Sequence, residues 1–399
     1  MNSLLLDKHL AQTTPFPVGL EVSHASGSYI YTKDGKAYLD MISGLAVSNL
    51  GHGNQAVKKA ITEQLEKYAH VMVYGEFEQE AQSGLAEKLT SLLPETLNNC
   101  YFVNSGTEAI EAAIKLCRRV TGRSKLMAFE GAYHGGTTGA LAISYNEQKK
   151  YAVRPLMPDV AFIELNNLTH LERITSEVAG VFLETIQGDA GIRIPTLEFM
   201  KALREKCTAM GAMLVLDEIQ AGMGRTGTLW AFEQFGIVPD VLCLGKALGA
   251  GLPMGALVTQ RSHMEKFTFD PMLGHITTFG GNPVICASAL AGLNELSGLL
   301  DTSSPAEITG LQAKSDFLKD ALGSHSKVKK IRIRGFFLAI ELETAEEVEK
   351  AFNYCLAHGV ITFWFLSCKN AFRLAPPLNI SMEDLKKGIA VIKDALDQA

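Results

Sequence analysis

The sequence is short of cysteine and lacks any cysteine pair of the spacing that disulfide frameworks or zinc sites use. Its seven cysteines include no C-x-x-C pair, and most lie within apolar runs. An odd number without close spacing predicts reduced thiols, as in the cytoplasm. The histidines also lack ligand spacing, so we expect no metal site.

Long apolar runs and basic clusters are missing as well. No uninterrupted run approaches the roughly 18 apolar residues of a membrane-spanning helix. The opening MNSLLLDKHLAQ has only a three-leucine patch before Asp7, which does not fit a secretory signal. The net charge of −6 and the scattered lysines and arginines exclude the clustered positive surface that nucleic acid requires. We therefore expect a soluble protein that contacts neither membrane nor nucleic acid.

Short apolar runs alternate with amphipathic segments through the middle of the 399 residues. The runs are CYFV (100–103), KLMAF (125–129), GVFLE (180–184), AMLVLDE (212–218), VLCLG (241–245) and MGALVTQ (254–260). Strands that are apolar throughout and separated by helices predict an α/β fold, with a mostly parallel sheet covered on both faces. Ligands of such sheets bind beyond the carboxyl ends of the strands.

The two ends of the chain have a different pattern. Residues 27–40 alternate around a turn at 33–36, which predicts a β-hairpin. The tail predicts a smaller α+β unit. We expect an N-terminal segment (1–50) that packs with this unit, a large domain (51–302) and a small C-terminal domain (303–399).

The strand ends carry residues suited to an anionic, ring-shaped ligand. Ser105 and Glu108 have the spacing of a capping box, and the N-terminus of the helix behind them can hold a phosphate. A well-capped helix without a ligand is the alternative. Tyr133 lies between glycines after KLMAF, where it can stack on a ring or simply pack within a turn.

Lys246 ends VLCLG in an otherwise uncharged run, and Asp217 lies in the end of AMLVLDE. A lysine with a lowered pKa is a nucleophile that forms a Schiff base with an aldehyde. If that aldehyde is pyridoxal phosphate, its ring nitrogen needs an anionic partner. An aspartate about 3 Å away contributes on the order of 5 kcal/mol at an effective dielectric near 20, before desolvation. Asp217 is the candidate for this partner.

Four motifs, in this order and spacing, carry a resemblance to a known family. They are NSGTEA, LVLDEIQAGMGRTG, LGKALGAGLPMGA and TTFGGNP. With them the chain resembles the class III (ornithine, acetylornithine and 4-aminobutyrate type) aminotransferases over nearly its whole length. The resemblance implies the fold-type-I architecture, with a seven-stranded sheet in the large domain, and pyridoxal 5′-phosphate as cofactor.

The resemblance also implies roles for individual residues. Lys246, Asp217 and Tyr133 are the expected catalytic residues, and Gln220 reaches the 3-hydroxyl side of the ring. The cofactor-binding set is Ser105, Gly106, Thr107, Tyr133, His134, Asp217, Gln220, Lys246 and Thr278, the last reaching the partner subunit's cofactor in a homodimer.

The substrate is expected to meet Arg373 and Glu184. Arg373 matches the arginine that grips a substrate carboxylate, and Glu184 is expected to pair with it while an ω-amino donor binds. The resemblance therefore implies transfer of an ω-amino group, from acetylornithine, ornithine, 4-aminobutyrate or a similar donor, to 2-oxoglutarate through ping-pong half-reactions. Gly136 departs from the family pattern, because ornithine-type enzymes commonly have a carboxylate-binding arginine there. That departure favours a diamine or 4-aminobutyrate.

Three other interpretations stay open at this point. An aminomutase or a decarboxylase would use the same cofactor and fold. A nicotinamide-dependent dehydrogenase is disfavoured because no G-x-G-x-x-G follows the first strand. A non-catalytic binding protein is disfavoured by the presence of both Lys246 and Asp217.

Overall fold

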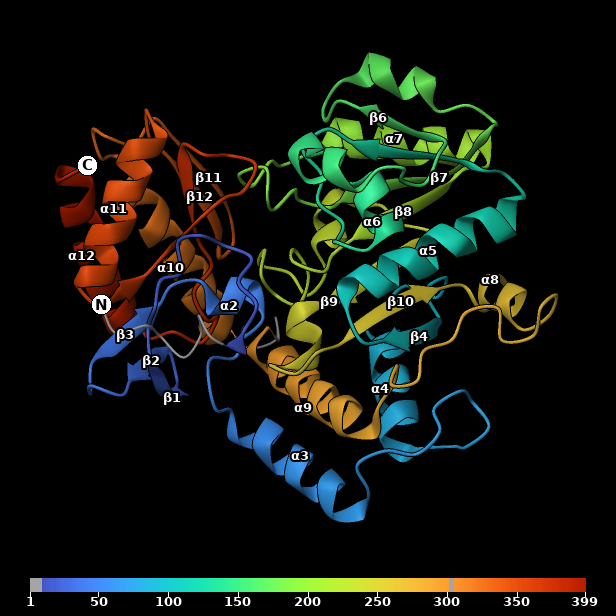
Figure 1. Ribbon diagram of the computed structural model, residues 1–399, viewed down its shortest axis with the longest axis horizontal. Coiled ribbons are helices and arrows are strands. Elements are labelled where there is room, and N and C mark those ends of the chain that lie inside the picture. The colour runs from blue at the N-terminus through green and yellow to red at the C-terminus, as the bar shows by residue number, and fades with distance from the viewer. Residues whose placement is uncertain (1–8, 301–304) are drawn as a thin grey trace.

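The computed structural model describes residues 9–300 and 305–399, and a seven-stranded sheet forms the centre of its larger part (Figure 1). The strand order is β4-β10-β9-β8-β7-β5-β6. Their bounds are β4 Asn99–Val103, β5 Lys125–Phe129, β6 Val160–Ile163, β7 Val178–Glu184, β8 Met213–Asp217, β9 Val241–Gly245 and β10 Gly255–Thr259. All pairings are parallel except those of β10 with β4 and β9. The predicted mostly parallel α/β sheet is confirmed; β6 was missed.

The strands of this sheet are apolar throughout because helices cover both faces. In β8, Met213 and Val215 pack into the cluster that includes α5 (Gly106–Thr121). Leu214 and Leu216 point to the opposite face, which α4 (Glu80–Ser91), α7 (Leu197–Met210) and α9 (Pro283–Leu299) cover. Successive side chains of a strand alternate between faces, so two covered faces demand an unbroken apolar run.

Two smaller sheets lie in the other part of the molecule (Figure 1). One contains β1 Val22–Ser26, β2 Tyr29–Thr32, β3 Ala37–Asp40 and β13 Val360–Ile361; the other contains β11 Lys330–Arg334, β12 Phe337–Glu341, β15 Ala371–Leu374 and β14 Phe363–Trp364. The predicted hairpin is β2–β3, and β3 pairs in parallel with β13, which joins the N-terminal segment to the tail. The predicted domain division stays a prediction, and its boundary at 302 lies outside the described residues.

The remaining helices surround these sheets. They are α2 Ser43–Ala46, α3 Gln55–Lys67, α6 Thr138–Ile143, α8 Arg261–Met264, α10 Pro305–Gly323, α11 Ala345–Ala357 and α12 Met382–Asp397. Among the helices of residues 9–300 and 305–399, none has both the length and the apolar character needed to cross a bilayer.

Candidate active site

The carboxyl ends of the parallel strands open into a cavity of about 250 Å³. Because these ends meet at one edge of the sheet, residues distant in sequence come together there. The predicted site residues that line the cavity are Gly106, Thr107, Tyr133, His134, Glu184, Asp217, Gln220 and Lys246. Ser105, Thr278 and Arg373 are not part of its lining.

Lys246 lies directly after β9, at the first residue of a short 3-10 turn. Its φ is +45°, a left-handed conformation that an L-residue adopts only where its surroundings impose it. Burial lowers the pKa of Lys246, and the positive charge of Arg373 lowers it further, against the carboxylates of Asp217, Glu184 and Asp189. A lowered pKa leaves more of the amine neutral at a given pH, which makes it a better nucleophile.

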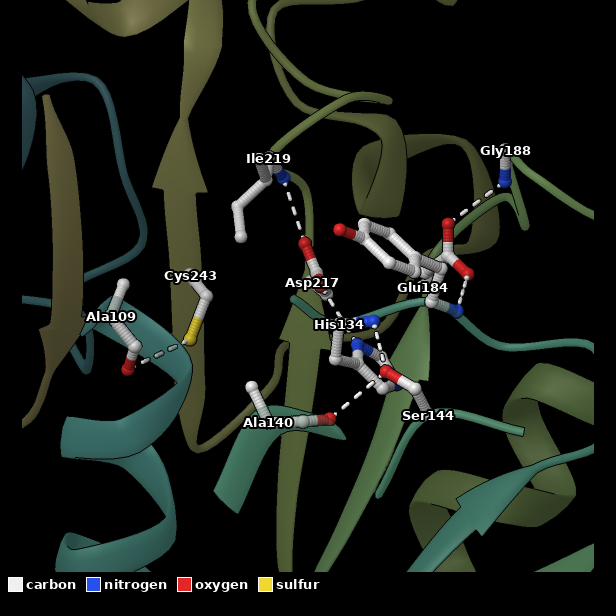
Figure 2. Close-up of polar contacts among 10 residues, drawn as sticks. Ala109, His134, Ala140, Ser144, Glu184, Gly188, Asp217, Ile219 and Cys243 are labelled. Carbon is white, nitrogen blue, oxygen red and sulfur yellow. Dashed lines mark hydrogen bonds and ion pairs between the residues drawn. The ribbon is translucent and has the colours of Figure 1, made fainter. Parts of the chain in front are cut away.

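Asp217, the last residue of β8, is buried and held through both carboxylate oxygens (Figure 2). Oδ1 accepts a hydrogen bond from the Ile219 N–H at 3.0 Å, and Oδ2 accepts one from His134 Nδ1 at 2.8 Å. The His134 N–H in turn donates to Ser144 Oγ at 2.9 Å. Because an ionised carboxylate can only accept, the hydrogen bond requires the proton on Nδ1 of His134; Nε2 is buried and has no partner among the described residues. His134 thus orients Asp217 as well as lining the cavity.

The N-terminus of α5 meets the cavity at Gly106 and Thr107. The Ser105 hydroxyl accepts the Glu108 N–H at 3.4 Å, as the capping pattern predicts. The Glu108 carboxylate accepts the Asn104 N–H at 2.6 Å, one residue before the partner a capping box uses. The first N–H groups of the helix have no intrahelical partners and carry partial positive charge, so they suit a phosphate.

Tyr133 lies in the loop after β5, and its side chain is 39% exposed. Its backbone N–H donates to Glu184 Oε1 at 2.9 Å. Burial of the ring, with the nearby carboxylates of Asp189 and Glu184, raises the pKa of Tyr133. The hydroxyl therefore stays protonated at neutral pH, and the ring is available for stacking.

The structure does not place Glu184 and Arg373 in an ion pair; their pairing during the reaction stays a prediction. Glu184 accepts a backbone N–H from Tyr133 and, as Figure 2 shows, one from Gly188 at 2.8 Å. Burial raises the pKa of Glu184 to about 7. Arg373, in β15, is buried with Nη2 at 3.4 Å from Asp189 Oδ1 and its guanidinium 4.3 Å from the Phe365 ring centroid.

Asp189 is a cavity residue that the sequence analysis missed. Besides Arg373, it accepts the Leu366 N–H at 3.2 Å and the Ser367 hydroxyl at 2.7 Å. It lies in the loop five residues beyond Glu184, in ETIQGDAG. The sequence does show a second acidic residue shortly after the end of β7, which could have indicated Asp189. Its partner Arg373 lies on a strand in the other part of the molecule and could not be recognised in this way.

The comparison with known proteins decides the family. A family model described as "Aminotransferase class-III" matches residues 11–396. The chain belongs to the class III aminotransferases. It is 37% identical over 398 residues to an acetylornithine aminotransferase of Methanopyrus kandleri, with 98% of both chains covered.

Two further similarities agree with this family. The aminotransferase is 36% identical to a LysW-aminoadipate semialdehyde/glutamate semialdehyde transaminase of Sulfurisphaera tokodaii over 326 residues, covering 81% of this chain and 82% of the relative. The crystal structure of a transaminase from Virgibacillus superposes with a TM-score of 0.90 at 26% identity, covering 99% and 98% of the two chains. The family decides against the nicotinamide-dependent dehydrogenase.

Class III aminotransferases use pyridoxal phosphate, and the chemistry of this cavity fits that cofactor. The cavity brings together an amine (Lys246), a fixed carboxylate (Asp217), the first N–H groups of α5 and an aromatic ring (Tyr133). These groups are the ones that an aldehyde, a ring nitrogen, a phosphate and a planar ring would require.

Proposed function

We propose that this class III aminotransferase moves the ω-amino group of an amino-acid donor to 2-oxoglutarate in two ping-pong half-reactions. The observation that carries the proposal is the buried pair of Arg373 and Asp189, of which Asp189 lines the same cavity as Lys246. An arginine can bind a carboxylate through two parallel hydrogen bonds. Asp189 neutralises Arg373 when no substrate carboxylate is bound to it. Such a pair suits an enzyme that binds two substrates, only one of which places a carboxylate at Arg373.

The chain's own residues divide the chemical work. When bound, pyridoxal phosphate supplies an aldehyde that takes up amines and a ring that withdraws electrons. We propose that Lys246 Nζ binds this aldehyde and then carries the proton to and from the substrate carbon. Asp217 keeps the ring nitrogen protonated, with His134 fixing the carboxylate.

The other cavity residues bind and orient in this proposal. Tyr133 stacks on the ring, and Gln220 contacts its 3-hydroxyl side. Gly106 and Thr107 hold the phosphate at the start of α5. The Ser105 hydroxyl accepts the Glu108 N–H, so its part in phosphate binding is to cap the helix.

Replacing Asp189 by asparagine is expected to affect the two half-reactions unequally. Without the carboxylate, Arg373 stays unneutralised while an ω-amino donor binds, so the single-turnover rate with that donor should fall about tenfold. The rate with glutamate should change by less than about threefold, because its own α-carboxylate neutralises the arginine. Single-turnover kinetics with each substrate measure both rates.

Glu184→Gln is the matched control, because Glu184 binds backbone N–H groups and not Arg373. It should lower both half-reactions by a similar factor. Equal losses in Asp189→Asn would contradict the proposed exchange of partners at Arg373.

For the donor, we propose an N-acylated diamino acid of the acetylornithine type. The support is full-length similarity to the acetylornithine aminotransferase of Methanopyrus kandleri. The second candidate is 4-aminobutyrate or a diamine, which Gly136 favours because it places no side chain at the cavity. A panel of acetylornithine, ornithine, 4-aminobutyrate, lysine and putrescine against 2-oxoglutarate and pyruvate separates these candidates. Glutamate formed from 2-oxoglutarate separates all of them from an aminomutase or a decarboxylase.

We also propose that the enzyme is a cytoplasmic homodimer in which Thr278 reaches the partner subunit's cofactor. Thr278 is exposed, and exposed apolar side chains flank it, namely Phe269, Met272, Leu273, Ile276 and Phe279. Four of them, Phe269, Met272, Leu273 and Ile276, line a hollow of about 1040 Å³ together with residues from segments 73–86 and 99–102. All seven cysteines are unpaired, which supports a reducing compartment.

Met272→Asp is expected to weaken this dimer. Met272 is 76% exposed in the single chain, so the substitution leaves the fold intact but places a charge in the proposed interface. The dimer dissociation constant should rise at least about tenfold in sedimentation velocity. Leu197→Asp, an exposed position at the start of α7, is the control and should leave the dimer unchanged. A wild-type chain that sediments at 43.2 kDa at all concentrations would contradict the proposal.

A further inference from the structure

Lys149 is a cation beside the cavity with no carboxylate partner. It ends the short 3-10 turn Glu147–Lys149, and its Nζ lies 4.8 Å from the centroid of the Tyr133 ring. The neighbouring Glu147 pairs with Lys150 and Arg154 instead. Within residues 9–300 and 305–399, Lys149 takes part in no ion pair, so its charge is available to a ligand.

The loop that carries Lys149 is hydrogen-bonded to two segments near the cavity, one next to Tyr133 and one that contacts Asp189. The Tyr145 N–H donates to the Ala132 carbonyl at 2.9 Å, next to Tyr133. Asn146 Nδ2 donates to Ser367 Oγ at 3.4 Å, and that hydroxyl donates to Asp189, the partner of Arg373. A short series of polar contacts thus connects the Lys149 loop to Arg373. Each cation contacts a residue that lines the cavity, Lys149 the ring of Tyr133 and Arg373 the carboxylate of Asp189.

A dicarboxylate substrate needs a positively charged partner for each of its two carboxylates. Glutamate and 2-oxoglutarate carry two carboxylates, and Arg373 accounts for one of them. Gly136 lines the cavity and provides no charge; a Cβ built there meets nothing within 4 Å. Gly136 and Tyr133 line the same cavity, and the flexible side chain of Lys149 lies over the Tyr133 ring, so Lys149 is a candidate partner for a second carboxylate there.

We propose that Lys149 receives the second carboxylate of a dicarboxylate substrate, while Arg373 receives the first. The proposal rests on the proposed function and adds a specificity residue to it. Lys149 leaves the Tyr133 ring when such a substrate binds, because a charge-assisted hydrogen bond to a carboxylate is stronger than a partly exposed contact with an aromatic face. A monocarboxylate acceptor such as pyruvate does not engage it.

Lys149→Met tests the proposal by comparing acceptors on the holoenzyme. KM for 2-oxoglutarate should rise about five- to tenfold, with kcat nearly unchanged and KM for pyruvate unchanged. Binding of glutarate, an unreactive dicarboxylate, should weaken by a similar factor in calorimetry, while butyrate binding is unaffected. Lys149→Arg keeps the charge and should stay within about twofold of wild type.

A rescue variant separates charge from structure. Adding Gly136→Arg to Lys149→Met supplies a cation from the other side of the open space, and it should restore glutarate binding. The proposal would be overturned if Lys149→Met weakened glutarate and butyrate binding equally, or weakened neither. It would also be overturned if KM rose for both 2-oxoglutarate and pyruvate, because Lys149 would then only position Tyr133. Glutarate binding is measured without turnover, so it tests the role of Lys149 independently of amino transfer. A wild-type enzyme that transfers no amino group would refute the proposed function without affecting the glutarate result.

Discussion

Lys246→Ala is expected to lower the single-turnover rate of amino transfer by about three to four orders of magnitude. Proton transfer by a positioned side chain contributes roughly 10²- to 10⁴-fold, and the covalent role of the amine adds to it. The substitution retains a Cβ at the left-handed position, so the loop is not relaxed as it would be by glycine. Stopped-flow absorbance of the bound cofactor after mixing with donor measures the rate.

Chemical rescue distinguishes loss of the amine from loss of the fold. A small alkylamine added to Lys246→Ala should restore part of the rate in proportion to its concentration. Lys386→Ala, on the exposed face of α12, should behave as wild type. Amino transfer at an unchanged rate in Lys246→Ala would contradict the role proposed for this residue.

Asp217→Asn should produce the second largest loss. The variant keeps the size of the side chain and an acceptor for the Ile219 N–H, but it removes the charge that holds a proton on the cofactor's ring nitrogen. A carboxylate about 3 Å from that nitrogen contributes on the order of 5 kcal/mol at an effective dielectric near 20, part of which desolvation offsets. We expect the single-turnover rate to fall roughly 10²- to 10³-fold, with donor affinity changed far less.

The neighbour of Asp217 provides a graded control. His134→Gln keeps a donor near Asp217 Oδ2 and should cost no more than about tenfold, because it loosens the carboxylate without removing its charge. If Asp217→Asn and His134→Gln were equally impaired, orientation and not charge would be the main contribution of Asp217.

The sequence predicted the main sheet because its central strands are buried on both faces. In β7 and β8 every residue is buried, so an unbroken apolar run identified each strand. Asp217 and Lys246 lie at the carboxyl ends of two such strands, and the carboxyl ends of parallel strands meet at one edge of the sheet. β6 was not predicted because only one of its four residues is buried, and a partly exposed edge strand has a less distinct apolar pattern in the sequence.

Contacts between the two parts of the molecule could not be predicted in the same way. Arg373 lies on β15, and its partner Asp189 lies in a loop, so no strand-end rule connects them. The hydrogen bonds of Glu184 to two backbone N–H groups, one in the loop after β5 and one in the loop after β7, likewise depend on geometry that the sequence does not express. Lys149 and Lys150 are adjacent and alike in the sequence; only the structure shows that Lys150 is buried and paired with Glu147, whereas Lys149 lies over Tyr133.

Reduction of the holoenzyme with borohydride, followed by peptide mass mapping, tests the central claim most directly. Borohydride fixes the cofactor to whichever amine binds it. We predict a single pyridoxyl-modified peptide, with the added mass on Lys246 at the end of β9. A modification on any other lysine, or an unmodified Lys246 in an enzyme that still transfers amino groups, would contradict the account.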